Sequence, residues 1–236
     1  MREEIIGDCR LILGDCLEVM PTLGKFDAVV TDPPYGIGEA AGKAKTRTSG
    51  LTSAQRGRDY RKDYGVDSWD DKTADDAVAM AISISRHAVI FGGNYYDLPP
   101  SSCWLIWDKE NGATDFADCE MAWTNLPKAV RRLRYLWNGC MRKERHIERR
   151  HPTQKPVGVM EWCIRHLPDT AETILDPFMG SGTTGVACVK LGRKFTGIEL
   201  EPKYFDIACK RIEEAYRQPD FFVPAPAPKP EQESML

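Results

Sequence analysis

Two short motifs, each placed directly after a run of apolar residues, constrain how this chain can fold. A DPPY motif at 32–35 follows the apolar run 27–31, and a DPFMGSG motif at 176–182 follows the run 173–175. Short apolar runs bounded by turn residues are typical of buried strands. Because open α/β sheets bind their ligands at the carboxyl ends of strands, we expect a ligand site at each motif.

Short apolar runs alternate with helical patterns along most of the chain. The predicted strands cover 10–13, 27–31, 88–91, 103–107, 119–123, 173–175 and 195–199, and the predicted helices cover 16–23, 74–87, a segment after Pro156, 182–191 and 203–217. This alternation predicts an α/β fold with a mostly parallel sheet and helices on both faces. With 236 residues the chain has room for one main domain, which we expect to cover 1–218.

Two segments lack the periodicity of helices and strands. Residues 36–66 are rich in Gly, Ser, Thr and basic residues, and a loop of this length is usually functional or disordered. Residues 219–236 are rich in Pro, Ala, Glu, Lys and Gln, a composition that cannot build a core. We expect a mobile basic loop at the first segment and a disordered tail at the second.

Cysteine and histidine spacing argues against a metal site. The eight cysteines form no CxxC pair, and the four histidines form no HExxH or comparable ligand set. We therefore expect no metal, and free cysteines in a reducing compartment. The chain also contains no apolar run long enough to span a bilayer and starts with no signal-peptide pattern, so we expect a cytoplasmic protein without membrane contact.

Basic residues gather in two segments although the net charge is only −3 and the pI is near 5.9. The first contains Lys43, Lys45, Arg47, Arg56, Arg58, Arg61 and Lys62, and the second contains Lys128, Arg131, Arg132, Arg134, Arg142, Lys143, Arg145, Arg149 and Arg150. A charge run is commonly only a solvated surface. Because these two are interleaved with aromatic residues and flank the motifs, we favour nucleic-acid contact.

The chemistry of the two motifs indicates group transfer to a base. The DPPY motif at 32–35 offers a carboxylate, a backbone carbonyl and an aromatic ring in one rigid turn, which suits a flat heterocycle held by its amino group. Gly180 and Gly182 allow a ligand to approach the backbone closely, and Thr183 opens a helix whose free N–H groups can bind an anion. The second set suits a cofactor that carries a nucleoside.

With two further motifs, the chain resembles a known enzyme family. The order DPPY (32–35), HPTQKP (151–156), DPFMGSGTT (176–184) and GIE (197–199) is similar to that of amino-group DNA methyltransferases that use S-adenosylmethionine. The resemblance covers about 14–217 and is to the subgroup in which DPPY precedes the FxGxG motif. It implies a Rossmann-like methyltransferase fold with a circularly permuted motif order, and double-stranded DNA as the substrate.

Cofactor contacts follow partly from the residues and partly from the resemblance. Glu199 at a strand end is suited to bind ribose hydroxyls, and its alternative role is a helix-capping acid beside Glu201. The resemblance implies further contacts: Asp176 and Phe178 with the cofactor, Asp15 with its adenine end, and Thr153 and Lys155 with its carboxylate region. Asp15 could alternatively cap the helix that follows it.

The DPPY residues are expected to carry the catalysis. The Asp32 carboxylate and the Pro33 carbonyl can each accept one N–H of an exocyclic amine, Pro34 stiffens the turn, and Tyr35 can stack on a base flipped out of the duplex. Methylation at carbon 5 of cytosine would need a cysteine nucleophile after a proline, and the chain has no Pro-Cys pair.

Several functions stay open at this point. An Asp at the first position leans towards adenine N6, with cytosine N4 as the alternative. An RNA methyltransferase, a protein-amide methyltransferase and a non-catalytic nucleic-acid-binding subunit are further alternatives. The segment 125–150 is a short candidate for target recognition. The sequence is compatible with a homodimer and does not identify a restriction endonuclease partner.

Overall fold

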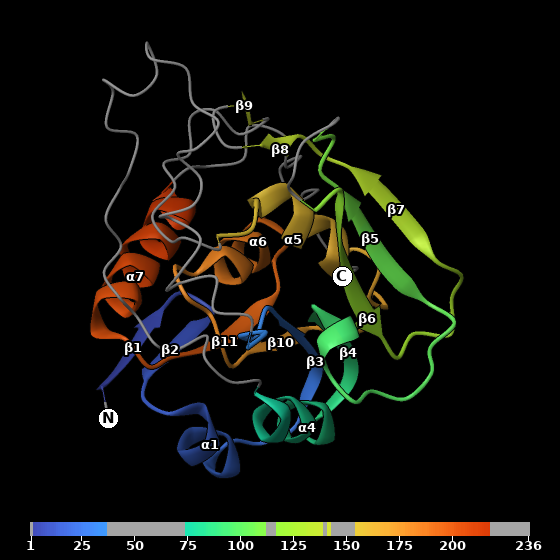
Figure 1. Cartoon of the computed structure of the whole chain (residues 1–236). Helices are drawn as coiled ribbons and strands as arrows, with labels where there is room; N and C mark the ends of the chain where they lie inside the picture. Colours follow the sequence, from blue (N-terminus) through green and yellow to red (C-terminus); the bar gives the residue numbers. More distant parts are fainter. Residues whose placement is uncertain (1, 37–73, 112–116, 139–140, 143–153, 218–236) are drawn as a thin grey trace, which may run out of the picture.

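The computed structural model describes residues 2–36, 74–111, 117–138, 141–142 and 154–217 (Figure 1). The predicted basic loop, except for residue 36, and the predicted tail at 219–236 lie outside the described residues. Within the described part, no helix is both long and apolar enough to cross a membrane.

One large sheet organises the chain. Its strands are β1 (Arg2–Ile6), β2 (Cys9–Leu13), β3 (Phe26–Thr31), β4 (Ser85–Phe91), β5 (Trp104–Asp108), β6 (Cys119–Thr124), β7 (Arg131–Arg134), β10 (Thr173–Asp176) and β11 (Lys194–Glu199), in the order β1-β2-β11-β10-β3-β4-β6-β5-β7. The run from β2 to β4 is parallel throughout, whereas β1 and β6 pair antiparallel with their neighbours. The short strands β8 (Trp137–Asn138) and β9 (Met141–Arg142) form a separate pair.

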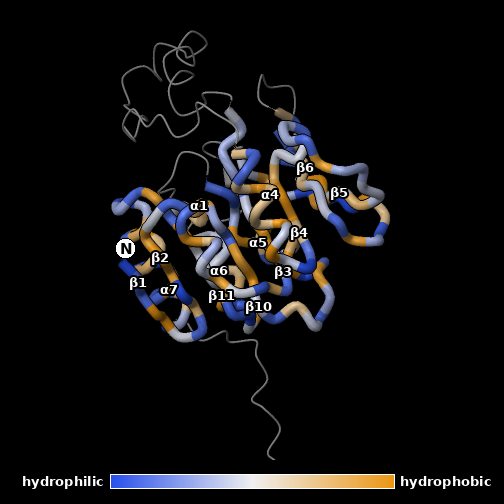
Figure 2. The backbone as a smooth tube through the Cα atoms, turned by 90° about the horizontal axis from the view of Figure 1, so that it is seen from below, coloured by the Kyte–Doolittle hydropathy of each residue, from blue (hydrophilic) through white to orange (hydrophobic). Residues whose placement is uncertain are grey.

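Helices cover both faces of this sheet, as the alternating pattern predicts (Figure 1). The helices are α1 (Cys16–Val19) and α4 (Asp75–Ser83) on one face, and α5 (Val157–Ile164), α6 (Thr183–Lys190) and α7 (Pro202–Arg217) on the other, with the 3₁₀ turns η1 (Met20–Thr22) and η3 (Gly93–Tyr95). Successive strand residues face opposite sides, so Val30 packs with α5 and α6 while Val29 packs with α1 and α4. Figure 2 shows the hydrophobic stretches along these central strands.

The predicted helix 74–87 is too long by one turn. The helix α4 ends at Ser83 and β4 already begins at Ser85, where it pairs with Phe26 of β3. The residues at this boundary fit either pattern, and pairing with β3 decides in favour of the strand. The edge strands β1 and β7 are absent from the prediction because most of their residues are charged, so their apolar signal is short.

The parallel strands end in one row, and this row positions the chemistry. Asp15 comes shortly after β2, Glu199 ends β11, Asp176 ends β10, Asp32 follows β3 and Gly92 follows β4. The register aligns these ends, since Glu199 pairs with Leu13 and Asp176 pairs with Gly197. The sheet therefore brings the carboxylates of distant motifs to a single edge.

Candidate active site

The side chain of Asp32 is held by two donors directly after β3. Its Oδ1 accepts a hydrogen bond of 2.5 Å from the Tyr35 hydroxyl, and its Oδ2 accepts one of 2.5 Å from Lys155 Nζ. The Pro34 carbonyl accepts a hydrogen bond of 2.5 Å from the Tyr96 hydroxyl. The DPPY turn is thus fixed by contacts at three of its positions, with the Pro33 carbonyl still predicted to accept the amine.

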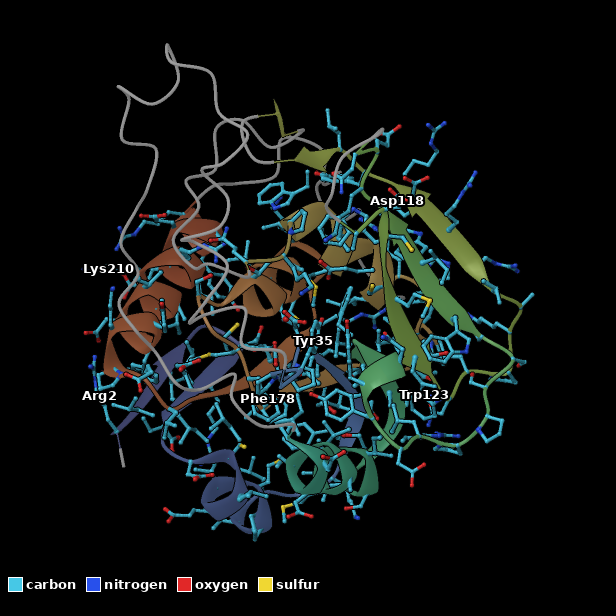
Figure 3. The ribbon with its side chains drawn as sticks, in the orientation of Figure 1. Arg2, Tyr35, Asp118, Trp123, Phe178 and Lys210 are labelled. Carbon is cyan, nitrogen blue, oxygen red and sulfur yellow. The ribbon has the colours of Figure 1, made fainter. Side chains whose placement is uncertain are left out.

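The Tyr35 ring lies near the middle of the molecule (Figure 3) and already has an aromatic partner. It stacks on the half-exposed Tyr95 of η3, with ring centroids 5.0 Å apart and planes inclined by 15°. Gly92 makes room for this ring: it has a φ of 64°, and a Cβ there would collide with Tyr35. Tyr95 and Gly92 therefore fix the position of the Tyr35 ring at the end of β4, and the stacking of this ring on a flipped base stays a prediction.

A cavity of about 450 Å³ joins the DPPY motif to the glycine-rich motif. Its lining includes Asp15, Asp32, Pro34, Gln154, Lys155, Asp176, Phe178, Gly180, Thr183, Glu199 and Tyr204. Phe178 and Tyr35, both labelled in Figure 3, pack against the same cluster of buried residues. Most of the predicted cofactor residues thus meet the DPPY carboxylate in one space.

The Asp176 side chain is buried and accepts hydrogen bonds from three donors. It accepts hydrogen bonds from the Thr31 hydroxyl at 2.7 Å, the Thr184 hydroxyl at 2.6 Å and the Phe178 N–H at 3.1 Å. Burial raises the pKa of Asp176 to about 6 in spite of these donors. The carboxylate therefore ties β3, β10 and α6 together at the edge of the cavity.

Glu199 faces the cavity with both oxygens engaged. Its Oε2 accepts the Gly180 N–H at 2.8 Å and its Oε1 accepts the Glu201 N–H at 2.8 Å. Burial raises the pKa of Glu199 to about 7. Because an ionised carboxylate has about four acceptor sites, capacity remains for ribose hydroxyls. The bond to Glu201 lies at the residue before α7, and both the ribose contact and the capping role of Glu199 stay predictions.

Asp15 has the capping role that was its alternative. Its side chain accepts the Leu17 N–H at 2.8 Å and caps α1, and because the residue also lines the cavity, its contact with the adenine end of the cofactor stays a prediction. Among the residues that the structure describes, no cluster of three or more His, Cys, Asp or Glu side chains is placed to hold a metal ion.

The two glycines of the second motif serve different contacts. Gly180 lines the cavity with a φ of 52°. Gly182, with a φ of 77°, instead faces α7, where a Cβ would lie 2.9 Å from the Cβ and 3.0 Å from the Cα of Ala208. Gly182 is therefore needed for helix packing, whereas the prediction gave it a direct approach to the cofactor.

Sequence reasoning missed Arg211, which braces this loop from α7. Arg211 is buried, and its Nη1 donates to the Ser181 carbonyl at 2.6 Å, to the Ser181 hydroxyl at 2.8 Å and to the Thr183 hydroxyl at 3.1 Å. A signal exists in the sequence: Arg211 follows the buried Ala208 by three positions and so shares its helix face.

Lys155 lines the cavity and makes two ion pairs there. Its ammonium pairs with Asp32 and lies 3.1 Å from Glu120 Oε2, and its contact with the carboxylate region of the cofactor stays a prediction. Glu120 was not among the candidate residues, because a single acid within a short strand carries no motif. Thr153 lies outside the described residues.

The candidate DNA contacts are only partly described. Arg131, Arg132 and Arg134 lie exposed on the edge strand β7, with Arg134 3.1 Å from Glu110. Lys43, Lys45, Arg47, Arg56, Arg58, Arg61 and Lys62 all lie outside the described residues, and so does much of the segment 125–150.

Comparison with known proteins shows what this architecture is similar to. The N6/N4 family model described as DNA methylase matches residues 106–210, slightly less than half of the chain. Together with the relatives below, this match supports the resemblance to amino-group DNA methyltransferases. The match begins in β5 and ends in α7, so it includes Glu120, Lys155 and the glycine-rich loop.

Two curated relatives and one solved structure extend the comparison. The type II methyltransferase M2.DpnII of Streptococcus pneumoniae is 43% identical over 86 residues, which are 35% of this chain and 31% of that protein, so the match spans less than a third of the relative. The type II methyltransferase M.HinfI of Haemophilus influenzae is 29% identical over 261 residues, covering 93% of this chain and 73% of that protein. The crystal structure of the M1.HpyAVI–SAM complex has a TM-score of 0.55 and 25% identity, covering 86% of this chain and 98% of that one.

Proposed function

We propose that this protein transfers a methyl group from S-adenosylmethionine to the exocyclic amino group of a base in double-stranded DNA, with adenine N6 as the target. One observation carries the proposal: the Asp32 carboxylate and the Glu199 carboxylate line the same cavity. An amine held at the first therefore lies beside a nucleoside cofactor held at the second. The family, and the SAM complex of M1.HpyAVI, support this assignment.

The residues of the cavity fit the proposed cofactor. Its volume of about 450 Å³ falls in the range of small-molecule sites. Glu199 offers acceptors to ribose hydroxyls, and the N-terminus of α6 at Thr183 offers N–H groups to a carboxylate. S-adenosylmethionine, when bound, supplies an electrophilic methyl group.

The DPPY residues provide what an amino group needs to react. The lone pair of an exocyclic amine is delocalised into the ring, so the amine is a weak nucleophile until it is oriented. Asp32 and the Pro33 carbonyl accept its N–H groups and thereby direct the lone pair, while Tyr35 supports the base. Proximity and alignment of this kind account for much of the acceleration in such transfers. The choice of adenine rests on the Asp at position 32.

A transfer assay tests the proposal. The protein is incubated with S-adenosylmethionine carrying a labelled methyl group and with duplex DNA, RNA or protein in separate reactions. We expect label in duplex DNA and background levels in RNA and protein. Incorporation into RNA or protein alone, or into none of the three, would contradict the proposed substrate.

Contact with DNA phosphates predicts a salt effect from β7. Replacing Arg131 and Arg132 with Gln should weaken DNA binding and reduce the slope of log affinity against log salt by roughly one for each lost phosphate contact. Binding is measured by fluorescence anisotropy across a salt series. The matched control replaces the exposed Lys203 and Lys210 of α7, on the opposite side of the molecule from β7 (Figure 3), and should leave the slope unchanged. An unchanged slope in the β7 variant would exclude this strand from the DNA interface.

A homodimer, an accompanying restriction endonuclease and a cytoplasmic location stay predictions. The match to the DNA methylase family model supports the more general expectation that DNA is the substrate.

A further inference from the structure

A line of alternating charges runs from the surface of the sheet to the DPPY motif. Lys109 Nζ lies 2.6 Å from Glu120 Oε1, and Glu120 Oε2 lies 3.1 Å from Lys155 Nζ. Lys155 in turn lies 2.5 Å from Asp32 Oδ2. The Lys155 side chain is only 7% exposed, and the other three side chains are 18–22% exposed, so these charges are shielded from water.

Separate parts of the fold supply these groups. Glu120 belongs to β6 and Lys109 follows β5, and the two strands pair antiparallel beyond β4. Lys155 precedes α5, whereas Asp32 follows the parallel strand β3. The ion pairs therefore connect the antiparallel edge of the sheet to the parallel strand that carries the catalytic motif.

Aromatic rings enclose the Lys155 ammonium. It lies 5.3 Å from the centroid of Phe91 and 5.6 Å from that of Tyr35. Ring faces attract a cation most strongly where water is excluded. The ammonium is thus confined between two rings and two carboxylates, which fixes its position relative to Asp32.

Because Asp32 is largely shielded from water, its pKa depends strongly on the charges beside it. Burial raises the pKa of Asp32, Lys155 opposes that rise, and Glu120 adds to it. Burial would lower the pKa of Lys155, but Asp32 and Glu120 together raise it above its ordinary value. The other groups that face Asp32 are the Tyr35 hydroxyl, whose own pKa burial raises, and the buried Asp176. In the described structure Lys155 is therefore the cation that balances Asp32.

We propose that Lys155 is a positioning residue for the Asp32 carboxylate. Glu120 competes with Asp32 for the Lys155 ammonium and thereby sets how strongly Lys155 stabilises the ionised form of Asp32. The inference deepens the proposed methyl transfer, on which it rests for its catalytic consequence. Lys155 fixes Oδ2, so that the free lone pairs of the carboxylate point at the incoming amine. Glu120 and Lys109 hold Lys155 in place from the far side.

The arrangement predicts shifts of opposite sign in two variants. In Lys155→Met, Asp32 loses its counter-charge while Glu120 stays, so the carboxylate should ionise at a pH roughly 1 to 3 units higher. In Glu120→Gln, the Lys155 ammonium pairs with Asp32 and no longer with Glu120, so the Asp32 carboxylate should ionise at a lower pH. Lys109→Met should also raise the pH at which Asp32 ionises, but by less than Lys155→Met, because Glu120 then interacts more strongly with Lys155.

Carbon-13 NMR tests these shifts without cofactor or DNA. The side-chain carboxyl of Asp32 is observed in protein labelled with carboxyl-¹³C aspartate and is assigned by its absence in Asp32→Asn. A control is Glu161→Gln, which removes the partner of Lys190 in a more exposed ion pair, 3.2 Å long, and should leave the Asp32 titration unchanged. The acid side of the pH profile of kcat should move with the NMR midpoint in each variant.

The outcomes are distinguishable. Opposite shifts in Lys155→Met and Glu120→Gln establish the positioning role, even if the wild-type protein transfers no methyl group, in which case only the proposed function fails. Equal shifts in one direction, or an unchanged midpoint in both variants, would overturn the inference. If Lys155→Met does not fold, Glu120→Gln decides alone: a lower midpoint supports the inference and any other result refutes it.

Discussion

Replacing Asp32 with alanine is expected to lower kcat for methyl transfer by on the order of a thousand-fold. The variant loses the acceptor that orients the amine, because Asp32 supplies the only carboxylate of the DPPY motif. The affinity for S-adenosylmethionine should change little, since we propose that Glu199 and the glycine-rich loop hold the cofactor at the adjoining strand ends. Transfer kinetics together with isothermal titration calorimetry measure both quantities.

Two controls accompany this variant. Removal of a buried carboxylate leaves Lys155 to Glu120 alone, so circular dichroism and thermal unfolding must show that the variant is folded. Asp97→Ala removes an exposed aspartate on the segment after η3 and should retain the parental rate. Turnover of Asp32→Ala near the parental rate would remove Asp32 from the catalytic role.

Replacing Glu199 with alanine is expected to weaken S-adenosylmethionine binding by roughly a hundred-fold. A carboxylate that accepts ribose hydroxyls contributes about 1.5 to 3 kcal/mol for each charged hydrogen bond, and a tenfold change corresponds to about 1.4 kcal/mol. Glu214→Ala, which removes an exposed glutamate of α7 that does not line the cavity, is the matched control and should bind normally. Calorimetry with the cofactor alone compares the two variants, and equal affinity in both would place the ribose elsewhere.

The same residue predicts the pH dependence of cofactor binding. Burial raises the pKa of Glu199 to about 7, so the carboxylate becomes protonated as the pH falls from 8 to 6. Protonation removes an acceptor, and the affinity of the wild-type protein should fall over this range. Without ligand, the stability of the folded state depends on pH in the opposite direction. Because the pKa of Glu199 is raised in the folded state, Glu199 contributes stability below the pKa that it has in the unfolded chain, and this contribution is lost as the pH rises through about 7. In Glu199→Ala this contribution to the pH dependence of affinity should disappear.

The sequence sufficed for the parts of the fold that carry a local signal. The runs before Asp32 and Asp176 are apolar and end at turn-forming residues, so strand, strand end and ligand edge followed together. Both the resemblance to amino-group DNA methyltransferases and the mostly parallel sheet with helices on both faces are confirmed. At the end of α4 the local patterns overlap, and only pairing with β3 fixes the boundary at Ser83.

Local sequence patterns did not predict the side-chain contacts between residues that are far apart in the chain. Lys155 reaches Asp32 across 123 positions of the chain, and Arg211 reaches Ser181 across 30. Neither distance can be inferred from spacing, because the parallel strand order determines which loops meet. Gly182 illustrates the same limit: its motif position suggested a ligand contact, while the fold places it against Ala208.

The most direct test of methyl transfer to an amino group is the identity of the modified nucleoside. Duplex DNA is treated with the protein and deuterium-labelled S-adenosylmethionine, digested to nucleosides and separated by liquid chromatography with mass spectrometry, with Asp32→Ala in parallel. We predict labelled N6-methyldeoxyadenosine from the wild-type protein and a loss of it in the variant. Labelled N4-methyldeoxycytidine would preserve the amino-group mechanism but contradict adenine as the target. Labelled 5-methyldeoxycytidine, or equal product from the variant, would contradict the mechanism itself.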